Sequence, residues 1–201
     1  MKGNVNLKNE KIENKEKNTN ELEEDEPPDT RTCVLDIEAE CAFPTDGRII
    51  CIGLLEAENG THHIFYDKHE EVLVRRFINY FNRQEFAKII GFNIAYDHRY
   101  IFSKCLKYRI PLGRFFHAGI VDIMHLLKNV KNTYCFNKPG TLNQWSTYLF
   151  GEGKLLQNSS VPLLYREGKI ASIIEYNRKD LELTLRLWER INLVLQGGVN
   201  G

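Results

Sequence analysis

Short blocks of apolar residues alternate with polar segments along the chain, and each block has the length of one strand or one helix. Four blocks rich in β-branched and aromatic residues predict strands, and they lie at residues 32–39, 48–57, 61–66 and 87–93. Asn59-Gly60 separates the second block from the third and favours a type I′ hairpin turn. We therefore expect an antiparallel hairpin near the start of the fold.

Other blocks carry the apolar spacing of amphipathic helices. In residues 70–84 this stripe consists of Val72, Val74, Phe77, Ile78 and Phe81. Further helices are predicted at residues 96–109, 142–150 and 172–195, and a short strand that runs into a helix at residues 117–130. Thr141 is placed to cap the helix that follows it. A hairpin followed by strands that alternate with helices predicts an α/β fold, in which helices cover a mixed sheet.

The first 30 residues differ in composition from the rest. They contain no aromatic residue and carry 5 Lys/Arg against 9 Asp/Glu, whereas residues 31–201 carry 22 against 18. Such a segment buries too little apolar surface to offset its ordering entropy. We expect residues 1–30 to be a disordered acidic tail, residues 31–196 to be one folded domain and residues 197–201 to be a flexible C-terminus. The tail would serve either as a solubilising segment or as a docking site for a helicase or polymerase partner.

The excess positive charge of residues 31–201 suits a polyanionic partner such as nucleic acid. No apolar run approaches the ~18 residues that span a bilayer, so we expect no membrane association. The N-terminus also lacks the apolar segment of a secretory signal. These features predict an intracellular, cytoplasmic protein.

Acidic residues in separated patches are the strongest candidates for chemistry. Asp36 and Glu38 lie in the first strand, where residues two apart point to the same side, ~7 Å from each other. Carboxylates within an apolar strand are costly unless a bound cation compensates their charge; the alternative is a strand end whose acids face solvent. Asp97 follows the strand at residues 87–93, at the position where α/β sheets place ligands. It could alternatively cap the next helix.

The last helix contributes Tyr176 and Asp180, which are four residues apart and therefore share one face. Hard oxygen ligands without His or Cys select Mg²⁺ or Mn²⁺. Two such ions ~3.5–4 Å apart suit in-line displacement at phosphorus. Because the ordinary pKa of tyrosine is about 10, we expect Tyr176 to orient the attacking water rather than to act as a base. The patches together predict a two-ion phosphodiester hydrolase.

The chain resembles the DEDD exonucleases at their three motifs, which correspond here to Asp36-Ile-Glu38, Asn93-x-x-Tyr96-Asp97 and Tyr176-x-x-x-Asp180. A tyrosine four residues before the last aspartate is similar to the DEDDy branch. Residues 140–154 and 175–191 most resemble the proofreading 3′–5′ exonuclease domain of family B DNA polymerases. The resemblance covers residues 31–195. It implies the RNase H-like fold, a mixed five-stranded sheet with an initial antiparallel hairpin and flanking helices.

The same resemblance implies roles for the acidic residues. Asp36 would bridge both metal ions, Glu38 and Asp180 would hold the ion on the nucleophile side, and Asp97 would bind the other ion, partly through water. The implied activity is 3′–5′ removal of nucleoside 5′-monophosphates from single-stranded DNA or unpaired 3′ ends, in DNA repair or proofreading. Because 201 residues leave no room for a polymerase palm, a free-standing nuclease is implied. Asp122 matches a position that such enzymes often use structurally, and we expect it to stabilise a turn or cap a helix.

Residues beside these motifs are candidates for substrate binding. Phe92 and Tyr96 could stack on unpaired bases. Asn93 could touch the substrate sugar or shape its turn, and Lys154 in the GEGK loop could contact a phosphate. Weaker candidates for stacking are Phe43, Phe115, Phe116 and Tyr134.

Three alternatives stay open beside these assignments. His98 is expected to be a helix-surface histidine rather than a ligand or base. An RNA 3′-end-trimming exonuclease would use the same chemistry. An inactive nucleic-acid-binding scaffold would use the same fold.

Overall fold

The computed structural model describes residues 31–128, 140–155 and 160–196. Its centre is a five-stranded sheet in the order β3-β2-β1-β4-β5. The strands are β1 (Thr32–Ala39), β2 (Ile49–Glu56), β3 (His62–Tyr66), β4 (Lys88–Gly91) and β5 (Gly119–Asp122). The first three strands pair antiparallel, whereas β4 pairs parallel with both β1 and β5. This mixed sheet confirms the predicted fold class. The segments predicted as a tail and a flexible C-terminus, residues 1–30 and 197–201, lie outside the described residues.

The turn between β2 and β3 differs from the predicted type I′ turn. That turn requires a positive φ at both central residues, but Gly60 has a φ of 70° while Asn59 is not among the residues with positive φ. The loop is longer and is closed by a hydrogen bond from Gly60 N to Glu56 O of 2.9 Å. The Asn59 side chain accepts a hydrogen bond from Thr61 N (2.8 Å). The hairpin is present, but its turn combines a left-handed backbone at Gly60 alone with a hydrogen bond to the Asn59 side chain.

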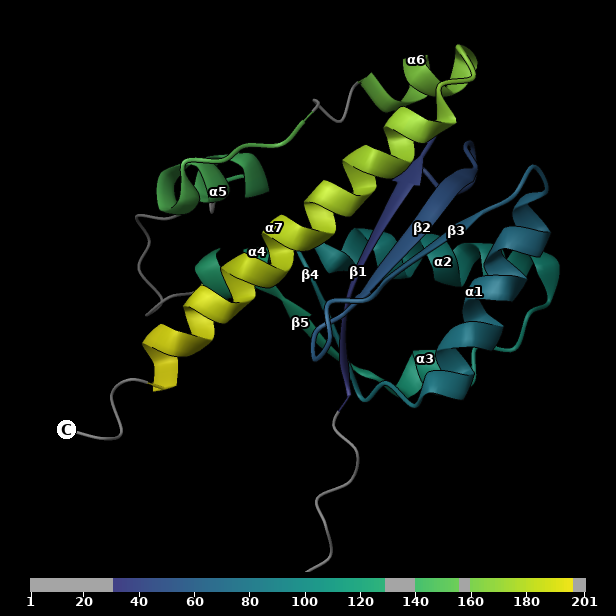
Figure 1. The fold of residues 1–201 in the computed structure, drawn as a ribbon. Helices are drawn as coiled ribbons and strands as arrows, with labels where there is room; N and C mark the ends of the chain where they lie inside the picture. The colour runs from purple at the N-terminus through teal and green to yellow at the C-terminus, as the bar shows by residue number, and fades with distance from the viewer. Residues whose placement is uncertain (1–30, 129–139, 156–159, 197–201) are drawn as a thin grey trace, which may run out of the picture.

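Helices cover both faces of the sheet (Figure 1). They are α1 (Glu70–Gln84), α2 (Ile94–Tyr108), α3 (Arg114–His117), α4 (Ile123–Lys128), α5 (Leu142–Phe150), α6 (Val161–Arg166) and α7 (Ile170–Gln196). The long helix α7 crosses one face over β1, β2 and β4, and α5 and α6 pack against it. On the other face α1 contacts β2 and β3, and α2 contacts β1 and β5. The result is a three-layer arrangement with the sheet in the middle.

The apolar residues of β1 divide between the two layers because successive side chains of a strand point to opposite faces. Leu35 and Ile37 belong to the cluster that α1 and α2 complete. Val34 belongs instead to a cluster with Leu181 and Leu187 of α7. The alternation continues along the strand and decides which face receives its acidic residues.

Most predicted elements correspond to observed ones, with specific exceptions. In α1, Leu73 is buried and Val72 is 41% exposed, so Val72 was wrongly assigned to the apolar stripe. The short helices α3 and α6 were not predicted, because four and six residues carry too little periodicity to be recognised. Among the described residues, none of the helices combines the length and the apolar character needed to cross a membrane.

Candidate metal centre

On strand β1, Asp36 and Glu38 lie on the face of the sheet that α7 covers. Because Val34 packs against α7 residues, the same alternation aims positions 36 and 38 at that helix. Asp36 is half-buried and Glu38 is only 7% exposed. The register of β1 against β2 shifts between Glu38 and Ala39, so the strand is irregular where the acidic pair ends.

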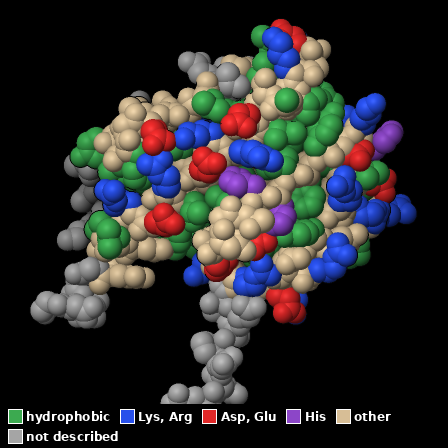
Figure 2. All heavy atoms as spheres, viewed as in Figure 1, with side chains coloured by type: hydrophobic (Ala, Val, Ile, Leu, Met, Phe, Trp, Pro, Cys, Tyr) green, Lys and Arg blue, Asp and Glu red, His purple; other side chains and the backbone are tan. Residues whose placement is uncertain are grey.

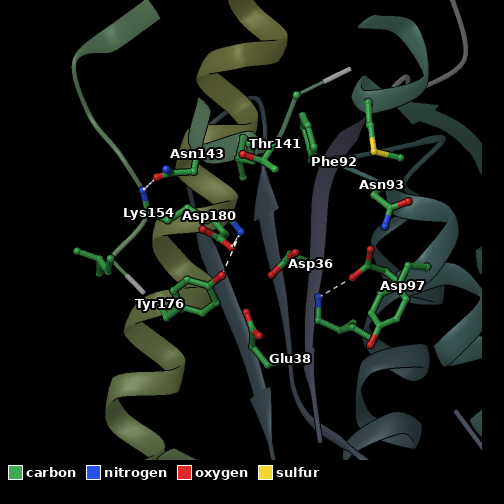
Figure 3. A pocket seen from close by; sticks show the side chains of 16 residues that line it. Asp36, Glu38, Phe92, Asn93, Asp97, Thr141, Asn143, Lys154, Tyr176 and Asp180 are labelled. Atoms are coloured by element: carbon green, nitrogen blue, oxygen red, sulfur yellow. Dashed lines mark hydrogen bonds and ion pairs between the residues drawn. The ribbon is translucent and has the colours of Figure 1, made fainter. Parts of the chain in front are cut away.

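Helix α7 brings a second set of polar groups to the same place. Tyr176 is 1% exposed and Asp180 2% exposed, and their four-residue spacing puts both on the side of α7 that faces the sheet. One carboxylate oxygen from each of Asp36, Glu38 and Asp180 lies within 4.8 Å of the other two. Segments separated by more than a hundred residues thus converge on one acidic cluster (Figure 3).

Asp97 reaches this region from the other layer. It lies in the first turn of α2, whose N-cap is Asn93, so the alternative that Asp97 caps the helix is wrong. The β1–β4 ladder ends at Val34 opposite Ile90. Beyond that point the Ile37 backbone N–H donates to Asp97 Oδ1 at 2.9 Å. Asp97 falls outside the group of three clustered carboxylates found in the described chain, and Figure 3 shows it across β1 from that group.

Nine of the residues that the sequence proposed for catalysis or substrate binding line a single pocket of about 770 Å³. Figure 3 shows Asp36 at its centre, with α7 on one side and α2 on the other. The residues are Asp36, Glu38, Phe92, Asn93, Tyr96, Asp97, Lys154, Tyr176 and Asp180. The pocket lies past the end of β4, the position at which open α/β sheets bind ligands.

Burial and mutual repulsion make these carboxylates reluctant to ionise in the absence of a cation. Burial, followed by the charge of Asp180, raises the pKa of Asp36 from 3.8 to about 7. Burial and the Asp36 carboxylate raise the pKa of Glu38 well above its ordinary value, and the same causes raise that of Asp97. Burial also raises the pKa of Asp180, an effect that Lys154 partly offsets. Such a site gains stability from any bound positive charge.

Lys154 supplies one positive charge from the loop after α5. Its Nζ forms an ion pair with Asp180 Oδ2 and donates a hydrogen bond to Tyr176 Oη at 3.0 Å. The loop is held in place because Asn143 Oδ1 accepts a hydrogen bond from the Lys154 backbone N–H (2.7 Å). The sequence offered Lys154 as a phosphate contact, and the structure adds this direct link to the acidic residues.

The donor set fits a hard divalent cation. All the clustered ligand atoms are carboxylate oxygens, the type that Mg²⁺ and Mn²⁺ prefer. In addition, Asp180 Oδ1 is buried and has no hydrogen-bond partner in the described part of the chain. A buried carboxylate oxygen without a partner is costly, and a metal ion would satisfy it. Asp36, Glu38 and Asp180 are therefore the residues that could hold such an ion.

Three of the residues proposed for substrate binding, Phe92, Asn93 and Tyr96, line the pocket at the start of α2. Phe92 and Tyr96 are half-buried, and Tyr96 Oη donates to Cys41 O at 3.1 Å. Asn93 has a left-handed backbone with φ of 64°, and its N–H donates to Asp122 Oδ1 at 3.0 Å. Asn93 thus shapes its turn, one of its two expected roles, while its side chain still lines the pocket. Asp122 Oδ1 also accepts from His125 N (3.3 Å), which confirms that Asp122 supports a turn and a helix start.

Several secondary expectations need correction. Phe115 is completely buried in the core and cannot stack on a base. His98 is only partly exposed on its helix, because its half-buried ring stacks on Phe115 with centroids 5.0 Å apart. Phe43 and Phe116 are exposed, whereas Tyr134 lies outside the described residues.

Sequence reasoning also missed residues that line this pocket or contact its acidic residues. Thr141 was predicted only as a helix cap, a role it fills through a capping box with Gln144, but it also lines the pocket. Asn143 was not singled out at all. Asn177 on α7 was missed as well, although it directly contacts Asp36. Its only sequence signal is its position next to Tyr176.

Comparison with known proteins places this geometry in a family. A family model described as RNase_H superfamily matches residues 33–192. A family B DNA polymerase from the hyperthermophilic archaeon Pyrobaculum calidifontis has a similar structure, with a TM-score of 0.68 and 17% sequence identity. That likeness covers 82% of this chain but 25% of the polymerase chain, and it shows the shared fold. Uncharacterized protein MJ0365 of Methanocaldococcus jannaschii is 26% identical over 176 residues, which cover 83% of this chain and 96% of that protein. The chain therefore belongs to the RNase H superfamily, a membership that supports a nuclease function.

Proposed function

We propose that this protein is a metal-dependent 3′–5′ exonuclease that hydrolyses single-stranded DNA or unpaired 3′ ends to nucleoside 5′-monophosphates. The observation that carries this proposal is the convergence of Asp36, Glu38 and Asp180, whose ligand oxygens lie within 4.8 Å of one another. Tyr176 on the same helix face as Asp180 adds the hydroxyl typical of the DEDDy motif. Membership of the RNase H superfamily supports the choice of phosphodiester chemistry.

Two Mg²⁺ or Mn²⁺ ions are the proposed cofactors. Asp36 would contact both ions, Glu38 and Asp180 one of them, and Asp97 the other. Asp97 lies outside the tight group, which suits its expected binding partly through water. When bound, the ions supply activation of the attacking water and stabilisation of the leaving 3′-oxygen.

Tyr176 and Lys154 would align the reacting groups around those ions. Burial, followed by the charge of Asp180, raises the pKa of Tyr176 far above its ordinary value, so its hydroxyl stays protonated at neutral pH. It can therefore orient a water by a hydrogen bond but cannot remove a proton from it. Lys154 Nζ, within 3.0 Å of that hydroxyl, is placed to contact a phosphate oxygen beside it.

The preference for unpaired ends rests on the rim of the pocket. Phe92 and Tyr96 present aromatic surface on which bases without a pairing partner can stack, and Asn93 would contact the sugar.

The proposed 3′–5′ direction and DNA preference come from the resemblance to proofreading domains, and the fold shared with a family B DNA polymerase supports them. Figure 2 shows acidic and basic side chains interspersed on the face that α7 covers. Local contacts in the pocket, rather than a large basic surface there, would therefore select the substrate.

Digestion of matched oligonucleotides tests this function. A 5′-labelled single-stranded DNA is incubated with the full chain, with and without Mg²⁺ or Mn²⁺, beside an RNA of the same sequence and the Asp36→Asn variant. A ladder that shortens from the 3′ end of the DNA, requires the metal and is absent with the variant is expected. Faster digestion of the RNA would favour the RNA 3′-end-trimming exonuclease. Binding of the DNA and RNA oligonucleotides in gel shifts, with no cleavage at any metal concentration, would favour the inactive nucleic-acid-binding scaffold.

The arrangement of the whole chain is part of the same proposal. Residues 31–196 would form the exonuclease domain, and the acidic segment 1–30 would recruit a helicase or polymerase in a repair or proofreading setting. The net charge of that segment, with 5 Lys/Arg against 9 Asp/Glu, suits a basic docking surface. Deletion of residues 1–28 should weaken partner binding while single-strand cleavage is kept. Unchanged partner binding by the deletion variant would contradict a docking role.

A further inference from the structure

The side chain of Asn177 contacts the strand residue at the centre of the acidic pocket. Asn177 Nδ2 donates a hydrogen bond to Asp36 Oδ2 at 2.7 Å and lies 3.3 Å from Asp36 O. Asn177 is completely buried, one residue after Tyr176 and three before Asp180 on α7. A neutral donor from the helix thus holds one oxygen of the Asp36 carboxylate.

The neighbouring strand β2 leaves room for the Asn177 amide. Gly53 on β2 is the direct partner of Asp36 in the β1–β2 ladder. A Cβ at position 53 would lie 1.9 Å from Asn177 Oδ1 and 2.8 Å from Leu181 Cδ1, so any side chain there would push the amide away from Asp36. The φ of Gly53 is not positive, and the need for glycine is therefore one of space rather than backbone conformation.

The orientation of the Asn177 amide leaves its own buried oxygen without a hydrogen bond from the described residues, which costs free energy. Asn177 Oδ1 is buried and has no hydrogen-bond partner among the residues the structure describes. The reverse orientation would place this oxygen against the Asp36 carboxylate, where two acceptors repel each other. A buried amide that leaves its own acceptor unpaired, in order to donate to one carboxylate, is poorly explained by packing alone.

We propose that Asn177 is a positioning residue that fixes the Asp36 carboxylate for divalent cation binding. The amide holds Oδ2 of Asp36, and one carboxylate oxygen of Asp36 lies within 4.8 Å of ligand oxygens of Glu38 and Asp180, the other members of the ligand group. Asn177 supplies no charge, so it orients Asp36 without competing with a metal ion for the negative charge of the site. Partners of metal ligands that act in this way typically change metal affinity about 10–100-fold when removed. This inference rests on the proposed metal-dependent function.

Cation binding by the metal-free full chain tests the inference without relying on catalysis. Mn²⁺ is titrated by isothermal calorimetry into the wild type, Asn177→Ala and the matched control Thr184→Ala, which removes another buried polar side chain of α7. Thermal unfolding without metal is recorded for all three proteins. We expect Asn177→Ala to weaken Mn²⁺ binding about 10-fold or more, while its metal-free melting temperature falls no further than that of Thr184→Ala. Cleavage by Asn177→Ala should recover as the Mn²⁺ concentration is raised, which a general packing defect would not do.

Asn177→Ser provides a second variant if the alanine protein does not fold, because its hydroxyl keeps a polar group in the buried position but is too short to reach Asp36. The same loss of Mn²⁺ affinity is expected. Wild-type Mn²⁺ affinity in either folded variant would overturn the positioning role while leaving the proposed nuclease intact. Failure of the wild type itself to bind Mn²⁺ would overturn both, so the two failures are distinguishable.

Discussion

Lys154 Nζ lies 3.0 Å from Tyr176 Oη and is ion-paired with Asp180, so a lysine from the loop after α5 places its charge inside the acidic pocket. Glu152 links this loop to α7, because its Oε2 accepts a hydrogen bond from Lys179 Nζ (2.8 Å) and forms an ion pair with Arg186 Nη1 (2.9 Å). The Lys154 ammonium therefore has a defined position beside Tyr176 and Asp180, the two residues of α7 that are proposed for catalysis. The ammonium should weaken metal binding, because it already occupies Asp180, but it should speed the reaction by contacting a phosphate.

Removal of the lysine should separate those consequences. Lys154→Ala takes away the ammonium that pairs with Asp180, so the metal-free protein should lose stability while its affinity for Mn²⁺ rises. With saturating metal the rate should fall about 10–100-fold, the effect of losing one charge-assisted hydrogen bond to phosphate. Calorimetry and single-turnover cleavage measure the two effects. Lys169→Ala, which removes a surface lysine paired with Glu167, should change neither, and a weaker Mn²⁺ affinity in Lys154→Ala would contradict the assignment.

Replacement of the central carboxylate should abolish the reaction without unfolding the protein. Asp36→Asn keeps the shape of the side chain but removes the charge proposed to contact both ions. A loss of several kcal/mol of transition-state stabilisation corresponds to about a 1000-fold or greater fall in rate. Because the variant also removes repulsion between buried carboxylates, its melting temperature without metal should equal or exceed that of the wild type. Retained cleavage, with an intact fold by circular dichroism, would rule out Asp36 as a ligand.

Loss of the tyrosine hydroxyl should be less damaging. Tyr176→Phe deletes one hydrogen-bonding group and no metal ligand, so we expect a rate about 10–100-fold lower with Mn²⁺ affinity unchanged. Pre-steady-state cleavage at saturating metal measures the first quantity and calorimetry the second. If Tyr176→Phe were more damaging than Asp36→Asn, the division of roles between them would be wrong.

The raised pKa of Asp36 predicts how stability depends on pH. Its folded value of about 7 exceeds the ordinary 3.8, so the folded state binds more protons than the unfolded state between those values. Without metal, this group therefore makes the protein less stable as the pH rises from about 4 to about 7. The raised pKa values of Glu38, Asp97 and Asp180 act in the same direction.

Thermal unfolding across that pH range, with a chelator and then with Mg²⁺, measures the effect. The chelated wild type should lose stability with rising pH more steeply than Asp36→Asn. Stabilisation by Mg²⁺ should grow over the same interval, because the ion binds the ionised carboxylates. Parallel pH profiles for the wild type and Asp36→Asn would show that this carboxylate does not titrate as the structure indicates.

Much of the fold follows from local patterns in the sequence. Residues 70–84 carry a stripe of apolar positions and form α1 with the predicted bounds, although Leu73 rather than Val72 belongs to its buried face. Thr141 caps α5 as predicted, since a capping hydrogen bond depends on residues three apart. The convergence of Asp36 and Asp180 was predicted from motif order rather than from periodicity. It is realised because β1 alternates its side chains and α7 crosses that strand.

The supporting residues of the site could not be read in the same way. The place of Asn177 beside Asp36 depends on Gly53 in the neighbouring strand, a coincidence of register that appears only when the sheet is assembled. The hydrogen bond from Ile37 N to Asp97 depends on where the β1–β4 ladder ends. Such contacts join residues that are distant in the chain, and neither propensity nor spacing encodes them.

A crystal structure of the protein soaked in Mn²⁺ is the most direct test of the central claim, because anomalous scattering locates the ions without reference to activity. We predict two anomalous peaks ~3.5–4 Å apart in this pocket, with Asp36 between them and Lys154 displaced from its pairing with Asp180. Absence of any peak among Asp36, Glu38 and Asp180 at millimolar Mn²⁺, with Lys154 still bound to Asp180, would contradict it.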